Sequence, residues 1–158
     1  MVRSALVLAA MAVVAASDVR AGVVAPSKPS QLVTAVRSAT APPCLIGVQV
    51  DQRVLPDGSW TPFVIPDGQV FIVTAYEFHK NEVLPDGEQV FGQLVIVSPS
   101  SVGFVSSISA IMKSLNAFAS KEVPSGIVVN SRAKLCLDSS GNINQADVIV
   151  HGFFAPDR

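Results

Sequence analysis

Apolar and polar residues alternate with a period of two along much of the chain, which is the pattern of strands with one buried and one wet face. The longest such run, residues 69–79, is predicted to be a central strand. Residues 89–97 are apolar on both faces, which is typical of a strand covered on both sides. Two late runs flank the polar loop 138–147 and are predicted to pair as a closing hairpin. The predicted strands are residues 46–50, 59–65, 69–79, 89–97, 133–137 and 148–154.

The motif Pro-Asp-Gly separates three of these runs and starts at Pro56, Pro66 and Pro85. Proline presets the backbone angle of the second turn residue, aspartate bonds to the nearby backbone, and glycine adopts a positive φ. The two copies of VLPDG diverge directly after the glycine, whereas a true repeat would continue through a whole structural unit. We therefore predict three turns, each between two strand-like runs.

One segment has a different period. Apolar residues recur at three- and four-residue spacing from Phe104 to Phe118, as on one face of a helix. A serine before the segment can cap its start, and Pro124 marks where it cannot continue. We predict an amphipathic α-helix near residues 102–119 that packs across the sheets.

These elements predict a mainly β fold, an antiparallel β-sandwich of jelly-roll character with one intervening amphipathic α-helix. The sandwich is expected to form a single domain over residues 44–158. Residues 22–43 are rich in proline, alanine and serine and are interpreted as a lead-in segment, in which residues 31–39 are a candidate short helix.

The N-terminus has the pattern of a secretory signal peptide over residues 1–21. Arg3 precedes an apolar run from Ala5 to Ala16, which is shorter than the roughly 20 residues that span a bilayer. We expect cleavage after Ala21, with an uncleaved N-terminal anchor as the alternative. The protein is then secreted, extracellular or periplasmic, without stable membrane insertion after signal removal.

The chain has two cysteines, Cys44 and Cys136. In an oxidising compartment an even pair most simply forms a disulfide, which is our prediction. The alternative is a catalytic thiol, which would need a histidine close by.

Charged residues make up 15% of the chain, against about 25% in a typical soluble protein. The positive charges are scattered, so we expect no nucleic-acid partner, which would need a concentrated basic surface. An adhesive or oligomeric module tolerates so few ionisable groups. We therefore predict a non-catalytic module that acts by surface binding or self-assembly, with a homo-oligomer as a possible state and with no cofactor.

The sequence contains no glycine-rich phosphate loop and no nucleophile-elbow motif, and we assign no catalytic residue. Glu77 and His79 share one face of the predicted central strand, and His151 lies in the last strand. If these strands are neighbours, the three residues can form a two-histidine, one-carboxylate metal site. The alternative function is thus a small cupin-like metal-binding protein or metal-dependent enzyme. The likeness to cupins is one of fold class only, because their His-x-His pair followed by glutamate is missing.

Trp60 follows the first Pro-Asp-Gly turn directly. An exposed ring at this place can stack on a sugar, which makes a carbohydrate-binding module a further alternative. More often such a tryptophan covers the rim of the core with its N–H toward water.

Overall fold

The computed structural model describes residues 25–26 and 28–157. The predicted signal peptide therefore lies outside the described residues. The described part of the chain forms ten strands and two short 3-10 segments, Pro29–Gln31 and Ile143–Gln145. None of its helical segments has the length and apolarity that a membrane span requires.

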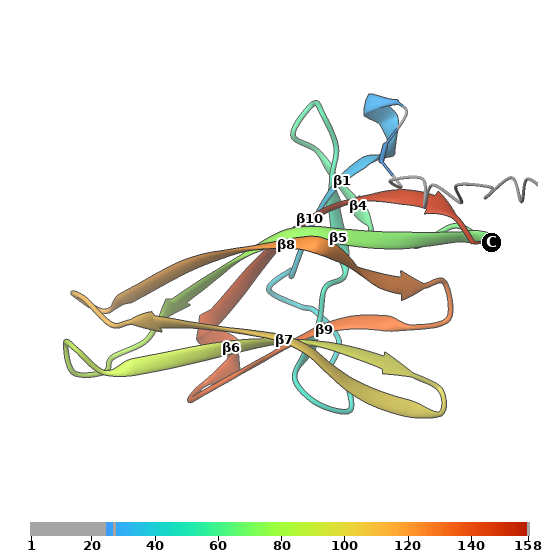
Figure 1. Cartoon of the computed structure of the whole chain (residues 1–158). Coiled ribbons are helices and arrows are strands. Elements are labelled where there is room, and N and C mark those ends of the chain that lie inside the picture. The colour runs from blue at the N-terminus through green and yellow to red at the C-terminus, as the bar shows by residue number, and fades with distance from the viewer. Residues whose placement is uncertain (1–24, 27, 158) are drawn as a thin grey trace, which may run out of the picture.

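The strands form two antiparallel sheets that lie as stacked layers (Figure 1). The six-stranded sheet has the order β4-β3-β1-β10-β5-β8, and the four-stranded sheet has the order β2-β9-β6-β7. The mainly β, sandwich-like fold is confirmed, and its jelly-roll character stays a prediction. The strands are β1 Leu32–Val36, β2 Val48–Gln49, β3 Gln52–Val54, β4 Trp60–Pro62, β5 Gln69–Asn81, β6 Gln89–Ser98, β7 Ser101–Ile111, β8 Asn116–Asn130, β9 Lys134–Ser139 and β10 Ala146–Pro156.

The hydrophobic core lies between the two sheets. Strand β5 contributes Phe71, Tyr76 and Phe78, which are fully buried, and β9 contributes Leu135 and Leu137 from the opposite layer. Most positions of β5 alternate between buried and less buried, as the period-of-two pattern predicts, whereas β9 buries three consecutive residues, 135–137.

All three Pro-Asp-Gly motifs are turns, as predicted. Their glycines, Gly58, Gly68 and Gly87, have φ values of 82°, 71° and 88°. The first turn is closed by a hydrogen bond from the Gly58 N–H to the Leu55 carbonyl, at 2.9 Å.

The predicted helix near residues 102–119 is wrong. This segment holds most of β7, a tight turn and the start of β8. Ser114 and Leu115 have φ values of 51° and 69°, and Lys113 and Asn116 exchange backbone hydrogen bonds around them. Positive φ at both central residues defines the two-residue turn that joins antiparallel strands. The segment also fits a period of two, with Ile108, Ala110 and Met112 buried, and its β-branched residues favour that conformation.

The predicted closing hairpin is also wrong. Strand β9 pairs with β2 and β6 in the four-stranded sheet, whereas β10 pairs with β1 and β5 in the six-stranded sheet. The loop between them crosses from one layer to the other. Both strands lie inside their sheets rather than at an edge.

The lead-in segment contributes to the sheet. Residues 32–36 form β1 between β3 and β10, where Val33 and Ala35 join the core. The candidate helix at residues 31–39 is therefore wrong, because most of this segment is a strand. The domain boundary predicted at residue 44 falls inside the part of the chain that forms the sheets. Burial of β-branched side chains on a sheet outweighs the weak helical tendency of this short segment.

The predicted disulfide is confirmed between Cys44 and Cys136. It ties the segment before β2 to β9, whose Cys136 is fully buried.

Two buried cations hold the loop that crosses between the layers. The Lys80 ammonium donates to the carbonyls of Ser140 and Asn142, at 2.9 and 2.6 Å, and lies 2.9 Å from the Glu82 carboxylate. The Arg37 guanidinium donates to the carbonyls of Ile143 and Ala146. These charge-assisted bonds satisfy carbonyls that the sheets leave unpaired.

Candidate functional site

Glu77, His79 and His151 lie together on the outer face of the six-stranded sheet. Glu77 and His79 project from β5 on the side opposite to the buried Phe78, and His151 projects from the neighbouring β10. In the register of these strands, Ala75 is the residue opposite His151. The adjacency of the two strands, which the metal hypothesis required, therefore holds.

The Glu77 carboxylate lies between the two imidazoles. Its Oε2 is 3.6 Å from Nε2 of His79, and its Oε1 is 3.5 Å from Nε2 of His151. The Nδ1 atom of His151 is 3.3 Å from Oγ1 of Thr34 on β1. The three ionisable side chains are partly exposed, so the group is a polar row on the surface across β1, β10 and β5.

Two further features surround this row. The His79 ring packs against Phe118 of β8 at a centroid distance of 4.7 Å, and its Nε2 atom is buried without a hydrogen-bond partner among the described residues. A bulge interrupts the β10–β5 pairing after His151, and another interrupts the β5–β8 pairing after Val73. Bulges bend strands and redirect side chains, so the sheet is irregular directly beside the row.

The row does not form a ready-made metal site. Zinc ligands lie about 2.0 to 2.2 Å from the ion and therefore converge on one point. Among residues 25–26 and 28–157, no group of three or more histidine, cysteine, aspartate or glutamate side chains is placed so that it could hold a metal ion. Each imidazole faces a different oxygen of Glu77. A single ion would need these side chains to rotate toward one another, so metal binding stays a prediction.

A groove of about 470 Å³ opens beside His151. Its walls include Leu32 and Thr34 of β1, Thr74 of β5 and Arg53 of β3. Sequence reasoning missed this groove because β1 was not expected to be a strand.

Trp60 lies on β4, at the edge of the six-stranded sheet opposite to β8. Its side chain is 58% exposed, and its backbone pairs with Val54. The ring is therefore separate from the histidine row, and its role in binding a carbohydrate stays a prediction.

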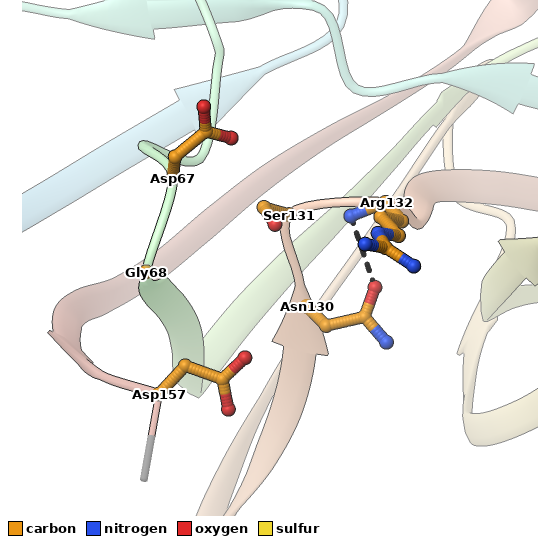
Figure 2. Close-up of a pocket in the computed structure, with 6 residues that line it drawn as sticks. All are labelled: Asp67, Gly68, Asn130, Ser131, Arg132 and Asp157. Atoms are coloured by element: carbon orange, nitrogen blue, oxygen red, sulfur yellow. Dashed lines mark hydrogen bonds between the residues drawn. The ribbon is translucent and has the colours of Figure 1, made fainter.

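A polar cavity of about 600 Å³ lies at one end of the sandwich (Figure 2). The carboxylates of Asp67 and Asp157 flank one side of it, and Asn130 and Arg132 flank the other. The backbone N–H of Arg132 donates to the side-chain oxygen Oδ1 of Asn130 at 3.0 Å. None of the residues predicted as a site contributes to this cavity.

The edge strands β7 and β8 carry most of the large exposed apolar side chains of the second half of the chain. Phe104 is 60% exposed and Phe118 is 57% exposed. The others on these strands are Val105 and Ile111 of β7 and Val128 of β8. Sequence reasoning missed this surface because it assigned the segment to a helix, although the scarcity of charge and the β-branched residues were visible signals of a strand.

A search against protein-family models finds none that matches the chain, and no curated protein sequence matches it significantly.

Proposed function

We propose that this protein is an exported, non-catalytic β-sandwich module that acts through its surface, by binding and in particular by self-assembly. The observation that carries the proposal is the row of exposed apolar side chains on β7, with Phe104 and Ile111 at 60% and 56% exposure. Exposed apolar side chains that share one edge are typical of interaction sites.

Two other features support this proposal. The disulfide between Cys44 and Cys136 is the kind of bond that persists in an oxidising compartment, which fits an exported protein with a signal peptide. The low content of charged residues, 15%, leaves little repulsion between copies of the chain.

Sedimentation velocity of the mature protein over a range of concentrations tests the proposal. We expect a homo-oligomer that dissociates on dilution. The Phe104→Lys substitution should weaken the association by about tenfold or more, which corresponds to about 1.4 kcal/mol, because it replaces an exposed ring with a charge. The matched control is Phe118→Lys on β8, where the side chain is equally exposed. A wild-type protein that stays monomeric at every concentration would contradict self-assembly.

A second candidate function is binding of a transition-metal ion by Glu77, His79 and His151. The observation that favours it is the position of the Glu77 carboxylate, 3.5 to 3.6 Å from both imidazoles. Histidine and carboxylate ligands suit zinc and non-haem iron. Zinc titration of the untagged wild type should then show binding that the double variant His79→Ala/His151→Ala lacks. Equal zinc uptake by both proteins would reject this candidate.

A further inference from the structure

The four sheet edges differ in how well they are protected against pairing with another strand. Strands β2 and β4 have only two and three residues. Strand β8 has 15 residues but carries Lys121, Glu122 and Pro124. Charged residues, proline and short length are the devices with which proteins block edge pairing. Three of the four edges are therefore blocked.

Strand β7 has none of these three devices, although a bulge at Val105 interrupts its pairing with β6. It has 11 residues, Ser101–Ile111, and contains neither a charged residue nor a proline. It pairs with β6 on one side only, so its other side offers unpaired backbone groups. Another extended strand can form hydrogen bonds with these backbone groups.

The composition of β7 favours a second copy of the same strand as the partner. In a pairing about a two-fold axis, residues near the axis lie opposite or close to their own copies, so a charge there would meet a like charge. The centre of β7 consists of Ser106 and Ser107, which are small and neutral. Ser106 accepts a hydrogen bond from the Tyr76 hydroxyl at 2.9 Å, which fixes this part of the edge to the core.

We infer that β7 pairs antiparallel with β7 of a second copy of this chain, about a two-fold axis at Ser107. This inference rests on the proposed self-assembly and names its interface. The two four-stranded sheets become one continuous sheet. An axis at Ser107 sets this small and exposed side chain opposite its own copy, with no charged residue in either strand.

One contact of the monomer has to open for this pairing. The Lys121 ammonium of β8 donates to the Ser107 carbonyl of β7 at 2.9 Å. A backbone N–H of the partner strand replaces this exposed donor in the dimer. Lys121 is on the surface and returns to water, so that its release opposes the pairing only modestly.

Cysteine cross-linking locates the interface. Ser107→Cys places a thiol next to the proposed axis, and Ser120→Cys places one on the exposed face of β8 as the matched control. Under mild oxidation, we expect the Ser107→Cys protein to form a covalent dimer linked at the substituted position. The Ser120→Cys protein should remain uncross-linked. Reduced peptide mass spectra identify the linked position and show that the native disulfide is intact.

The outcomes separate this inference from the proposed function. A wild-type oligomer in sedimentation together with cross-linking at position 107 supports both. A wild-type oligomer whose Ser107→Cys variant does not cross-link overturns the β7 interface and leaves self-assembly standing. A wild-type monomer at all concentrations overturns both. If Ser107→Cys fails to fold, the lysine variants test the interface instead. Loss of the oligomer in Phe104→Lys but not in Phe118→Lys supports pairing through β7, and an oligomer that Phe104→Lys leaves intact overturns it.

Discussion

The carboxylate of Glu82 contacts both the Lys80 ammonium and the backbone N–H of Asn142, in the loop between β9 and β10. The hydrogen bond from Lys80 holds the pKa of Glu82 below its ordinary value of 4.5, and the backbone N–H of Asn142 acts in the same direction against the opposing effect of desolvation. Lys80 itself is 1% exposed, so this group anchors the loop to the interior of the sandwich.

This lowered pKa predicts a stability that depends on pH. The unfolded chain binds the proton near pH 4.5, whereas the folded chain binds it only at lower pH. The stabilisation by Glu82 is thus fully present above pH 4.5 and is lost as the pH falls through the folded pKa. Urea unfolding of wild type and Glu82→Gln at several pH values checks this, with the exposed Glu88→Gln as control. The difference between wild type and Glu82→Gln should shrink as the pH decreases, and a constant difference would contradict the role of Glu82.

The face on which a side chain lies could be predicted wherever the alternation of side chains along a strand determines it. Glu77 and His79 are two residues apart in a strand, so they share a face whatever the fold is. Their meeting with His151 depended on the adjacency of β5 and β10, which no local pattern contains. Lys80 shows the opposite case, since it lies at a core position of β5 and its burial requires the carbonyls of a loop 60 residues away.

The turn between β7 and β8 contains a bulky residue in an unfavourable conformation. Leu115 has a φ of 69°, where a side chain other than that of glycine crowds the backbone. The two-residue turn that this chain forms prefers glycine at such positions. We predict that Leu115→Gly raises the free energy of unfolding by about 1 kcal/mol, since the exposed leucine side chain contributes little burial.

Chemical denaturation measures this effect. The control is Leu45→Gly, which removes another exposed leucine, at a position without positive φ. It should bring no gain. A loss of stability in Leu115→Gly would mean that the turn does not have the conformation described above.

Lys121 is the only charged side chain that donates to the edge of β7 among the described residues, and it therefore competes with a partner strand. We predict that Lys121→Met strengthens self-association several-fold, because no ammonium has to leave the Ser107 carbonyl. Lys134→Met, at an exposed position of β9, is the control for the loss of a positive charge. Sedimentation equilibrium compares the two variants, and an equal dissociation constant in both would show that Lys121 does not protect the edge.

The β7–β8 hairpin also shows why a helix was expected. Apolar residues between Phe104 and Phe118 satisfy spacings of three, four and two at once, so periodicity alone does not decide between helix and strand. The turn at Ser114 and Leu115 contains neither glycine nor asparagine, the residues that usually mark such a turn. The sequence therefore predicts one continuous element here instead of a hairpin. The Pro-Asp-Gly turns carried that signal and were predicted correctly.

The disulfide links parts of the chain that are 92 residues apart, from the segment before β2 to the middle of the four-stranded sheet. A loop of this length stabilises the folded state by about 4 to 5 kcal/mol through the entropy of the unfolded chain. We predict a loss of this size when the bond is reduced, measured by denaturant unfolding with and without reductant. The double variant Cys44→Ala/Cys136→Ala should be equally destabilised and insensitive to reductant. An unchanged midpoint on reduction would contradict this prediction.

The mainly β class and the disulfide could be predicted because they depend on composition, periodicity and a single pair of cysteines. The assignment of strands to sheets could not. Strands β9 and β10 are consecutive and apolar, which favours a hairpin locally, yet Lys80 and Arg37 hold the loop between them across the two layers. Such a crossing depends on contacts that are distant in sequence, and these leave no local pattern.

Self-assembly through β7 is the central claim, and a native mass spectrum of the untagged protein at several concentrations tests it most directly. One spectrum reports the subunit number, whether the predicted signal peptide is cleaved and at which position, and any retained metal ion. We predict an even-numbered oligomer of chains that begin at Gly22, in equilibrium with the monomer. A spectrum that contains only the monomer at every concentration would contradict the claim.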